Sequence, residues 1–429
     1  MSTKALIDYA KYDSYKDSGI NELGQIPERW ELLSNKHIFS IKSSRVGKKS
    51  EDYDLLSLTL KGIVKRDMEN PQGKFPAEFD TYQEVKAGDF VFCLFDVEET
   101  PRTVGLSEFD GMITGAYTVL EVSPDFDKTF IYYFYLNLDN EKKLKPLYRG
   151  LRNTIPKDWF MSYKTFIPTY KEQIAIANFL DQKTIQIDQA INLKQQQIAK
   201  LNEYKQITIQ NAVTKGLDAN AKMKDSGIDW IDEIPENWVT KRLKYLVKIR
   251  KRIIGYEGVN VLSITQNGVK VKDITSGEGQ LAMDYSKYQI VNVGDFAMNH
   301  MDLLTGYVDI SKFDGVVSPD YRVFTNETDL LTSNYLINIL RMGYKQKIFY
   351  KYGQGVSMLG RWRLPADNFN NFSIPIPSIA EQNEITKFID IKIAEIDSAI
   401  ELERQQIEQL KEYKTILINQ AVTGKIKVC

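Results

Sequence analysis

The chain contains the pentapeptide Lys-Asp-Ser-Gly-Ile twice, as residues 16–20 and again as residues 224–228. Each copy is followed at the same interval by Ile-Pro-Glu and a tryptophan, which is Trp30 in the first case and Trp238 in the second. The displacement between the copies is 208 residues, close to half of the 429 residues in the chain. A displacement of this size indicates that one half of the sequence repeats the other.

Further matches continue the repeat through both halves. They are Gly88-Asp89-Phe90 with Gly294-Asp295-Phe296, Arg152 with Arg361, Pro156 with Pro365, and Ile167-Pro168 with Ile376-Pro377. The residues between these anchors diverge, although the order and the near-constant spacing of the anchors hold. This pattern is typical of two similar scaffolds that carry different recognition surfaces. An old duplication without any division of function is the alternative.

Each half contains two segments of different composition. Residues 17–170 and 225–378 are rich in Gly, Asp, aromatic and β-branched residues, in short runs such as residues 90–92. These runs predict domains that combine many short strands with a few helices. Residues 172–213 and 381–422 contain no Pro or Gly, so each segment predicts one continuous helix.

The two predicted helices are expected to pair with each other. Apolar residues recur along them at alternating steps of four and three, which is the seam of a coiled coil. The expected helix-pairing and subunit-docking residues are Leu180, Ile187, Ile191, Ile198, Leu201, Ile389, Ile393, Ile396, Ile400, Ile407 and Leu410. Lys205 and Lys414 fall at equivalent positions, which favours a paired register. An ordinary amphipathic helix packed on its own domain explains less, because about 40 residues span roughly 60 Å.

Connectivity predicts how these parts are arranged. A short polar linker, residues 214–224, follows the first helix, so the second domain is expected at its far end and the second helix returns antiparallel. The predicted fold is α+β: two homologous mixed α/β domains separated by two long antiparallel coiled-coil helices, pseudo-two-fold and nearly circular. The expected divisions are residues 1–171 (with 1–16 packed on this domain), 172–213, 214–224, 225–380, 381–422 and the tail 423–429.

Composition limits the kind of protein that the sequence encodes. Lys and Arg total 56 against 57 Asp and Glu, which gives a net charge of −1 and a pI of about 6.3. A self-sufficient DNA-binding domain is usually basic, so a DNA-binding role requires clustered charge or partners that contact much of the phosphate backbone. Two cysteines and two histidines are too few for a disulfide framework or a metal site. No run of about 18 apolar residues is present, so a cytoplasmic protein without a membrane role is expected.

The sequence lacks the common catalytic motifs of several enzyme classes. There is no phosphate-binding Gly-x-x-x-x-Gly-Lys-Ser/Thr loop, no Gly-x-Ser-x-Gly and no His-Glu-x-x-His. Asp125 and Glu141, with Lys142 and Lys143, superficially fit a metal-dependent nuclease, but the second half has no equivalent. One alternative is therefore a pseudo-dimeric nuclease or transferase that uses these residues. A coiled-coil assembly protein with no DNA role is another, and a non-catalytic chain is favoured over both.

The repeated motifs resemble those of a known family. Each half opens with Lys-Asp-Ser-Gly-Ile and Ile-Pro-Glu-x-Trp, and closes with Ile-Pro and Glu-Gln running into a helix that ends in Ala-Val-Thr, at 212–214 and 421–423. Over essentially its whole length the chain resembles the specificity subunit, HsdS, of type I restriction–modification systems.

The resemblance implies a division of labour among several subunits. Two target-recognition domains would each read one half of an interrupted double-stranded DNA site, and the helical spacer would set the half-site separation and dock two modification subunits. Those subunits would bind S-adenosylmethionine and methylate adenine, while separate restriction subunits would hydrolyse ATP. Neither cofactor is expected on this chain.

Residues that would contact DNA are expected in basic or amide-bearing loops at equivalent places of the two halves. The front loops supply Arg45, Lys48 and Lys49 in the first half, and Arg250, Lys251 and Arg252 in the second. The back loops supply Arg149, Arg152, Asn153 and Lys157 in the first half, and Gln354, Ser357, Arg361 and Arg363 in the second. The front clusters favour phosphate contacts, with a solvated edge as the alternative. Arg361 has a structural alternative in an ion pair with Asp367, and Trp362 is expected against DNA sugars or on the core.

Overall fold

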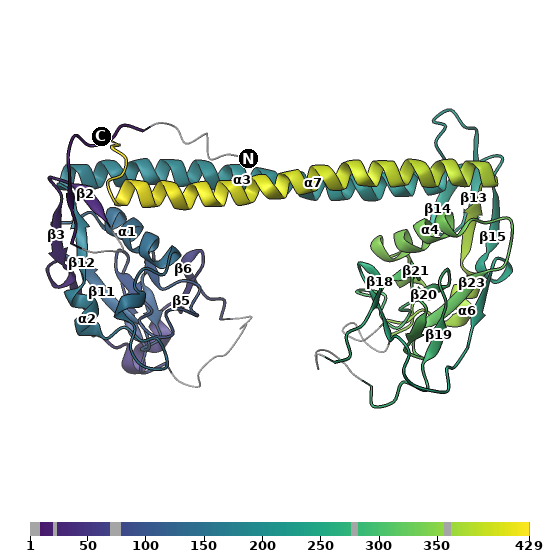
Figure 1. Ribbon diagram of the computed structural model, residues 1–429, viewed down its shortest axis with the longest axis horizontal. Helices are drawn as coiled ribbons and strands as arrows, with labels where there is room; N and C mark the ends of the chain where they lie inside the picture. Colours follow the sequence, from purple (N-terminus) through teal and green to yellow (C-terminus); the bar gives the residue numbers. More distant parts are fainter. Residues whose placement is uncertain (1–8, 20–23, 69–78, 276–281, 356–361, 429) are drawn as a thin grey trace. The chain divides into compact units, whose positions relative to one another are not determined.

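The computed structural model describes residues 9–19, 24–68, 79–275, 282–355 and 362–428 (Figure 1). The chain divides into two compact units. Unit 1 comprises residues 1–194 and 405–429, and unit 2 comprises residues 195–404. Both long helices pass from one unit into the other, so each unit contains one globular domain and half of each long helix.

The globular domain of unit 1 combines short antiparallel strands with helices. Its strands are β1 (Tyr15–Asp17), β2 (Gln25–Pro27), β3 (Glu31–Ser34), β4 (Phe39–Ile41), β5 (Leu56–Thr59), β6 (Gly62–Lys65), β7 (Gln83–Val85), β8 (Phe90–Phe92), β9 (Val104–Leu106), β10 (Gly111–Ile113), β11 (Thr118–Val122) and β12 (Lys164–Ile167). Its helices are α1 (Lys128–Asn140), α2 (Lys157–Ser162) and the 3-10 turns η1 (Asn35–His37), η2 (Gly47–Asp52) and η3 (Lys145–Leu147). The central sheet has the order β4-β11-β8-β9, and the two-stranded pairs are β1-β2, β3-β12, β5-β6 and β7-β10.

The globular domain of unit 2 repeats this plan. Its strands are β13 (Met223–Ile228), β14 (Ile231–Pro235), β15 (Val239–Arg242), β16 (Val247–Arg250), β17 (Leu262–Thr265), β18 (Gly268–Val271), β19 (Gln289–Val291), β20 (Phe296–Met298), β21 (Val308–Ile310), β22 (Gly315–Val317), β23 (Arg322–Asn326) and β24 (Ser373–Ile376). Its helices are α4 (Ser333–Lys345), α5 (Ile348–Lys351), α6 (Ala366–Asn371) and the 3-10 turn η4 (Leu243–Tyr245). The central sheet has the order β16-β23-β20-β21, and the pairs β13-β14, β15-β24, β17-β18 and β19-β22 match those of unit 1.

Aromatic side chains form the core of each domain. The Gly-Asp-Phe anchors supply Phe90 and Phe296, which begin the second inner strand of each central sheet and have no exposed surface. The tryptophans that close the repeated motif are equally buried, and each indole N–H donates to the first glutamate of a long helix. The distance is 3.2 Å from Trp30 to Glu172 and 3.0 Å from Trp238 to Glu381. Each repeated motif therefore joins a domain to the start of its helix.

The long helices are α3 (Tyr170–Lys215) and α7 (Ile379–Val422). In unit 1, Asp188 pairs with Lys414 at 2.7 Å, and Lys194 further along α3 contacts Gln406 nearer the start of α7. Rising numbers on α3 thus meet falling numbers on α7, which makes the helices antiparallel within unit 1. In unit 2, Lys205 pairs with Asp397 at 2.7 Å. The prediction of mixed α/β domains with two long helices is confirmed.

The predicted seam residues of both helices lie away from solvent. Leu180, Ile187, Ile389, Ile396, Ile400 and Ile407 are buried, and Ile191, Ile198, Leu201, Ile393 and Leu410 are half-buried. Neither these helices nor any other helix in the described ranges has a stretch apolar enough to cross a membrane.

The C-terminal tail lies beside the N-terminal segment of unit 1 (Figure 1). The backbone N–H of Lys427 donates to the Ala10 carbonyl oxygen at 2.6 Å, and the Tyr15 hydroxyl donates to the Gly424 carbonyl oxygen at 3.1 Å. The described part of the first sixteen residues thus packs on this domain through the tail.

Candidate nucleic-acid interface

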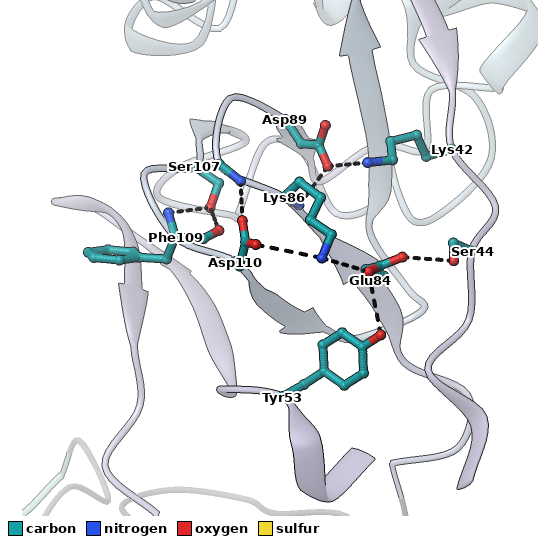
Figure 2. Close-up of polar contacts among 10 residues, drawn as sticks. Lys42, Ser44, Tyr53, Glu84, Lys86, Asp89, Ser107, Phe109 and Asp110 are labelled. Atoms are coloured by element: carbon teal, nitrogen blue, oxygen red, sulfur yellow. Dashed lines mark hydrogen bonds and ion pairs between the residues drawn. The ribbon is translucent and has the colours of Figure 1, made fainter. Parts of the chain in front are cut away.

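A buried aspartate closes the same turn in both domains. Asp89 accepts a hydrogen bond from the backbone N–H three residues earlier at 2.7 Å, and Asp295 accepts the equivalent bond at 2.8 Å. Each carboxylate also binds a cation from the front of its domain. In unit 1 this cation is Lys42, at 2.7 Å (Figure 2), and in unit 2 it is Arg252. The turn is therefore fixed in the same way in both domains, while its cationic partner differs.

Figure 2 shows a second carboxylate that organises the front of unit 1. Glu84 pairs with the Lys86 ammonium group at 2.9 Å and accepts hydrogen bonds from the hydroxyls of Ser44 at 3.0 Å and Tyr53 at 3.4 Å. The Lys86 hydrogen bond, followed by that of Ser44, lowers the pKa of Glu84 below its ordinary value. Glu84 is thus ionised at neutral pH and neutralises Lys86.

The predicted front cations of unit 1 lie just beyond this network. Arg45 is exposed and its backbone forms an isolated bridge to Gln83, the first residue of β7. Lys48 and Lys49 lie in the exposed turn η2. None of the three forms an ion pair with a residue in the described ranges, so their charges are available to a phosphate.

The predicted front cations of unit 2 are arranged differently. Arg250 forms an ion pair with Glu327, and Arg252 pairs with Asp295. Lys251 is exposed and has no ion pair among the described residues. Two of the three front cations of this domain therefore have a structural partner, in contrast to the front cations of unit 1.

The back loops rise from the same two-residue bridge in both domains. Arg149 is bridged to Thr154, and Gln354 is bridged to Arg363. In each case the two backbone hydrogen bonds measure 2.8 and 3.0 Å. The bridge encloses residues 150–153 in unit 1 and the longer segment 355–362 in unit 2. The loop of the second domain is therefore an extension built on the same base.

The predicted residues within the first loop take three different positions. The Arg152 guanidinium binds Asp96, with its Nε atom 3.1 Å from a carboxylate oxygen, and this hydrogen bond lowers the pKa of Asp96. Asn153 has a φ angle of +43°, so it occupies the left-handed region and allows the backbone to turn at this point. Lys157 is exposed at the start of α2. The carboxylate that pairs with Arg152 precedes the loop, and it is not Asp158, the counterpart of Asp367.

Arg149 is stacked on an exposed tryptophan that the sequence did not single out. The centre of its guanidinium group lies 3.8 Å from the centroid of the Trp159 ring, and the indole is 45% exposed. The Nη1 atom donates to the backbone carbonyl oxygens of Tyr148 at 2.6 Å and Pro146 at 3.3 Å. The repeat marks the buried neighbour Phe160, which matches Phe369, but it has Asn368 in place of Trp159, so no shared pattern points to an exposed indole there.

For the back loop of unit 2, the structure describes the residues at the base, which include Gln354 and Arg363. Gln354 and Arg363 are exposed, whereas Ser357 and Arg361 lie outside the described residues, as does any pair between Arg361 and Asp367. The Trp362 ring is half-buried, with its centroid 4.6 Å from that of Tyr350.

Comparisons with known proteins agree on one family. The sequence model of the type I restriction modification DNA specificity domain matches residues 235–412. The type I restriction enzyme MjaVIII specificity subunit of Methanocaldococcus jannaschii is 27% identical over 318 residues, which covers 70% of each chain. A candidate MjaX specificity subunit of the same organism is 24% identical over an alignment of 450 positions, which covers 99% of each chain. The family model and both relatives support an S subunit, because each is a specificity domain or specificity subunit of a type I system.

Solved structures show that the fold of this chain is also shared. A chain from a study of complex assembly and conformational transition in a type I R-M system superimposes with a TM-score of 0.63 and 11% identity, covering 92% of this chain and 98% of that one. The HsdS subunit of Thermoanaerobacter tengcongensis gives a TM-score of 0.50 and 11% identity, covering 94% and 98% respectively.

The carboxylates of the nuclease alternative do not lie together in this chain. Asp125 precedes α1 and Glu141 follows it, so about 20 Å of helix separates them. Lys142 pairs with Asp139 at 2.8 Å, and Lys143 pairs with Glu141. Within the described ranges, no three His, Cys, Asp or Glu side chains gather as a metal ion would require. The nuclease hypothesis is therefore wrong for these residues.

Proposed function

We propose that the chain is the non-catalytic DNA-reading subunit of a type I restriction–modification complex, with each globular domain reading one half of a bipartite site. One observation carries this proposal: the two domains keep the same buried turn and the same loop base, yet place different side chains on them. Residues 1–171 and 225–380 are the proposed target-recognition domains, joined by the helices 172–213 and 381–422 through the linker 214–224.

Of the cations that the sequence singled out, those without an ion pair in the described ranges are the proposed DNA contacts. In unit 1 they are Arg45, Lys48, Lys49, Arg149 and Lys157, and in unit 2 they are Lys251 and Arg363. Because 56 Lys and Arg are balanced by 57 Asp and Glu, the chain has no excess of positive charge and alone supplies only part of the phosphate contacts. Modification subunits bound to the same DNA would supply the others.

The long helices are proposed to hold the half-site recognition domains at a fixed separation, in a pseudo-two-fold and nearly circular arrangement. The contact between the C-terminal tail and the N-terminal segment of unit 1 supports the circular closure. Leu193 and Leu402 occupy equivalent positions on α3 and α7 and are 58% and 54% exposed. Two equivalent exposed leucines suit two copies of a modification subunit. Such subunits would carry the S-adenosylmethionine site, and restriction subunits would carry the ATP site.

The proposal is tested by co-expressing this chain with a modification subunit and mapping methylated adenines across the host genome. We expect one bipartite motif with a fixed gap, which disappears when this chain is omitted. Exchanging the first domain for that of a relative should change one half of the motif only. Methylation that is indifferent to the chain, or to the exchange, would contradict the proposal and favour an assembly role without DNA reading.

The spacer is tested separately by lengthening both helices by the same few residues within their paired region. Because the helices run antiparallel, only a matched insertion preserves pairs such as Lys205–Asp397. The gap between the half-sites should change while both half-sites stay the same. An unchanged gap in a folded variant would show that the helices do not set it.

A further inference from the structure

The base of the back loop holds one residue of each domain at an equivalent point. Arg149 and Gln354 are the first residues of the two bridges, with identical backbone hydrogen-bond distances. The residue after each bridge also bonds to the central sheet. In unit 1 the backbone N–H of Ile155 donates to the Leu94 carbonyl oxygen, two residues beyond β8, at 2.8 Å. In unit 2 the backbone N–H of Leu364 donates to the His300 carbonyl oxygen, two residues beyond β20, also at 2.8 Å. The central sheet thus fixes this position in the same way in both domains, and both side chains are exposed.

Arg149 is held as a planar fork. One face of the guanidinium lies on the Trp159 indole, and Nη1 is bound by the carbonyl oxygens of Tyr148 and Pro146. Its Nε and Nη2 atoms have no hydrogen-bond partner among the described residues. Unlike Arg152, Arg149 has no carboxylate partner among these residues either. The Nε and Nη2 atoms therefore present two parallel N–H donors on a positioned guanidinium whose charge no described carboxylate neutralises. Such a pair of donors matches two acceptors that lie in one plane.

Gln354 stands on an aromatic support of its own. A Cβ atom at Gly355 would lie 2.9 Å from the Trp362 ring, so the backbone beside Gln354 rests directly against that indole. Trp362 packs in turn on Tyr350. The Gln354 amide has no hydrogen-bond partner in the described ranges, and it presents one donor and one acceptor.

These two side chains match different bases. An arginine fork pairs with the O6 and N7 acceptors of guanine in the major groove, whereas a glutamine amide pairs with N6 and N7 of adenine. We propose that Arg149 and Gln354 are equivalent base-reading residues, with Arg149 specifying guanine in one half-site and Gln354 specifying adenine in the other. This inference rests on the proposed function, and it adds the base that each domain reads at its loop base.

The decisive experiment maps methylation by complexes of the chain and a modification subunit that carry Arg149→Gln or Gln354→Arg. Arg149→Gln should change a single guanine of one half-site to adenine and leave the other half-site intact, and Gln354→Arg should do the reverse in the other half. Each wrong base should reduce methylation about ten- to a hundredfold. Lys48→Gln is the matched control, because an exposed cation that binds phosphate should weaken methylation without altering the motif.

A second measurement uses the unaltered chain, so a variant that fails to fold does not decide the matter. Replacing the predicted guanine by 7-deazaguanine removes the N7 acceptor, and binding by the wild-type complex should weaken about tenfold. A chain-dependent bipartite motif that contains no guanine sensitive to Arg149→Gln or to the 7-deaza substitution would overturn this inference and leave the proposed function intact. Absence of any chain-dependent motif would overturn the proposed function instead.

Discussion

The two domains keep the same buried turn aspartate but pair it with cations of different origin. In unit 1 the turn aspartate Asp89 binds Lys42, the residue that follows β4, whereas in unit 2 Asp295 binds Arg252, two residues beyond β16. The hydrogen bond that each aspartate accepts from the backbone N–H of its turn is nearly the same length. A buried carboxylate needs a cation but not a particular one. Duplication has therefore preserved the groups that fix the backbone and exchanged those that only neutralise charge.

The helix that covers each sheet shows a larger difference. In unit 1 the buried Asp139 near the end of α1 pairs with Arg102 at 3.1 Å and Lys142 at 2.8 Å. At the corresponding point of α4, unit 2 has Tyr344, whose hydroxyl donates to the Asn299 carbonyl oxygen at 2.7 Å. Unit 1 thus depends on buried ion pairs at a place where unit 2 uses an aromatic ring and one neutral hydrogen bond.

The largest expected effect follows from this difference. Asp139→Asn should lower the free energy of unfolding of unit 1 by about 3 kcal/mol, because two poorly exposed cations lose their shared carboxylate. Tyr344→Phe should cost unit 2 only about 1 kcal/mol, since one neutral hydrogen bond is lost. Denaturant titration with hydrogen-exchange readouts on α1 and α4 measures both. Equal losses in the two units would show that the ion pairs of unit 1 contribute no more than the neutral contact.

A second comparison concerns the glycine that follows each long helix. Gly424 and Gly216 have φ angles of +68° and +76°, which disfavour any residue with a side chain. A Cβ atom at Gly424 would lie 2.4 Å from Pro27, whereas one at Gly216 would have no contact closer than 3.2 Å. Gly424→Ala should destabilise unit 1 by about 2 kcal/mol and release the C-terminal tail, while Gly216→Ala should cost about 1 kcal/mol.

Thermal unfolding of the two alanine variants distinguishes these outcomes, with protease sensitivity of the tail as the second readout. A Gly424→Ala protein as stable as Gly216→Ala would mean that Pro27 moves aside easily. The tail contact would then be weaker than its packing indicates.

The sequence predicted features that depend on periodicity and order, and these are the features that the repeat preserves. The absence of Pro and Gly predicted α3 and α7, and the equivalent positions of Lys205 and Lys414 were found opposite Asp397 and Asp188. Both pairs join residues more than 190 positions apart, so no local pattern revealed the acidic partners.

The candidate interface was less predictable, because counting basic residues does not show which of them are already paired. Arg250, Arg252 and Arg152 bind carboxylates that lie between 43 and 77 residues away. Stacking of Arg149 on Trp159 depends on the position of α2 against the loop, and a sequence does not report this.

A third comparison concerns how acid affects the stability of the two domains. In unit 2 the strand β20 is followed by His300, whose pKa is lowered to about 4 by burial and then by Arg322 and Arg363, whereas unit 1 has Leu94 at this place. The unfolded histidine takes up a proton near pH 6.5 and the folded one does not. The contribution of neutral His300 to the free energy of unfolding is therefore fully present above pH 6.5, and it is lost as the pH falls toward 4.

His300→Leu should remove this loss, which amounts to about 1 kcal/mol between pH 7 and pH 5 for a half-buried group. The Tm of the variant is compared with that of the wild type at both pH values, with exchange in α4 reporting on unit 2. If the two proteins lose Tm equally on acidification, the side chain of His300 does not control the acid response of unit 2.

The smallest expected effect concerns the helix pair, where the two units are most alike. Asp188→Asn breaks the pair with Lys414 in unit 1, and Asp397→Asn breaks the pair with Lys205 in unit 2. Each aspartate side chain is more than half exposed, so each substitution should cost about 0.5 kcal/mol or less, and the loss should shrink in high salt. The two losses should also be equal, because the geometry of the pairs is the same. Denaturant titration at low and high salt measures them, and a clear inequality would show that the symmetry of the helix contacts does not extend to their energies.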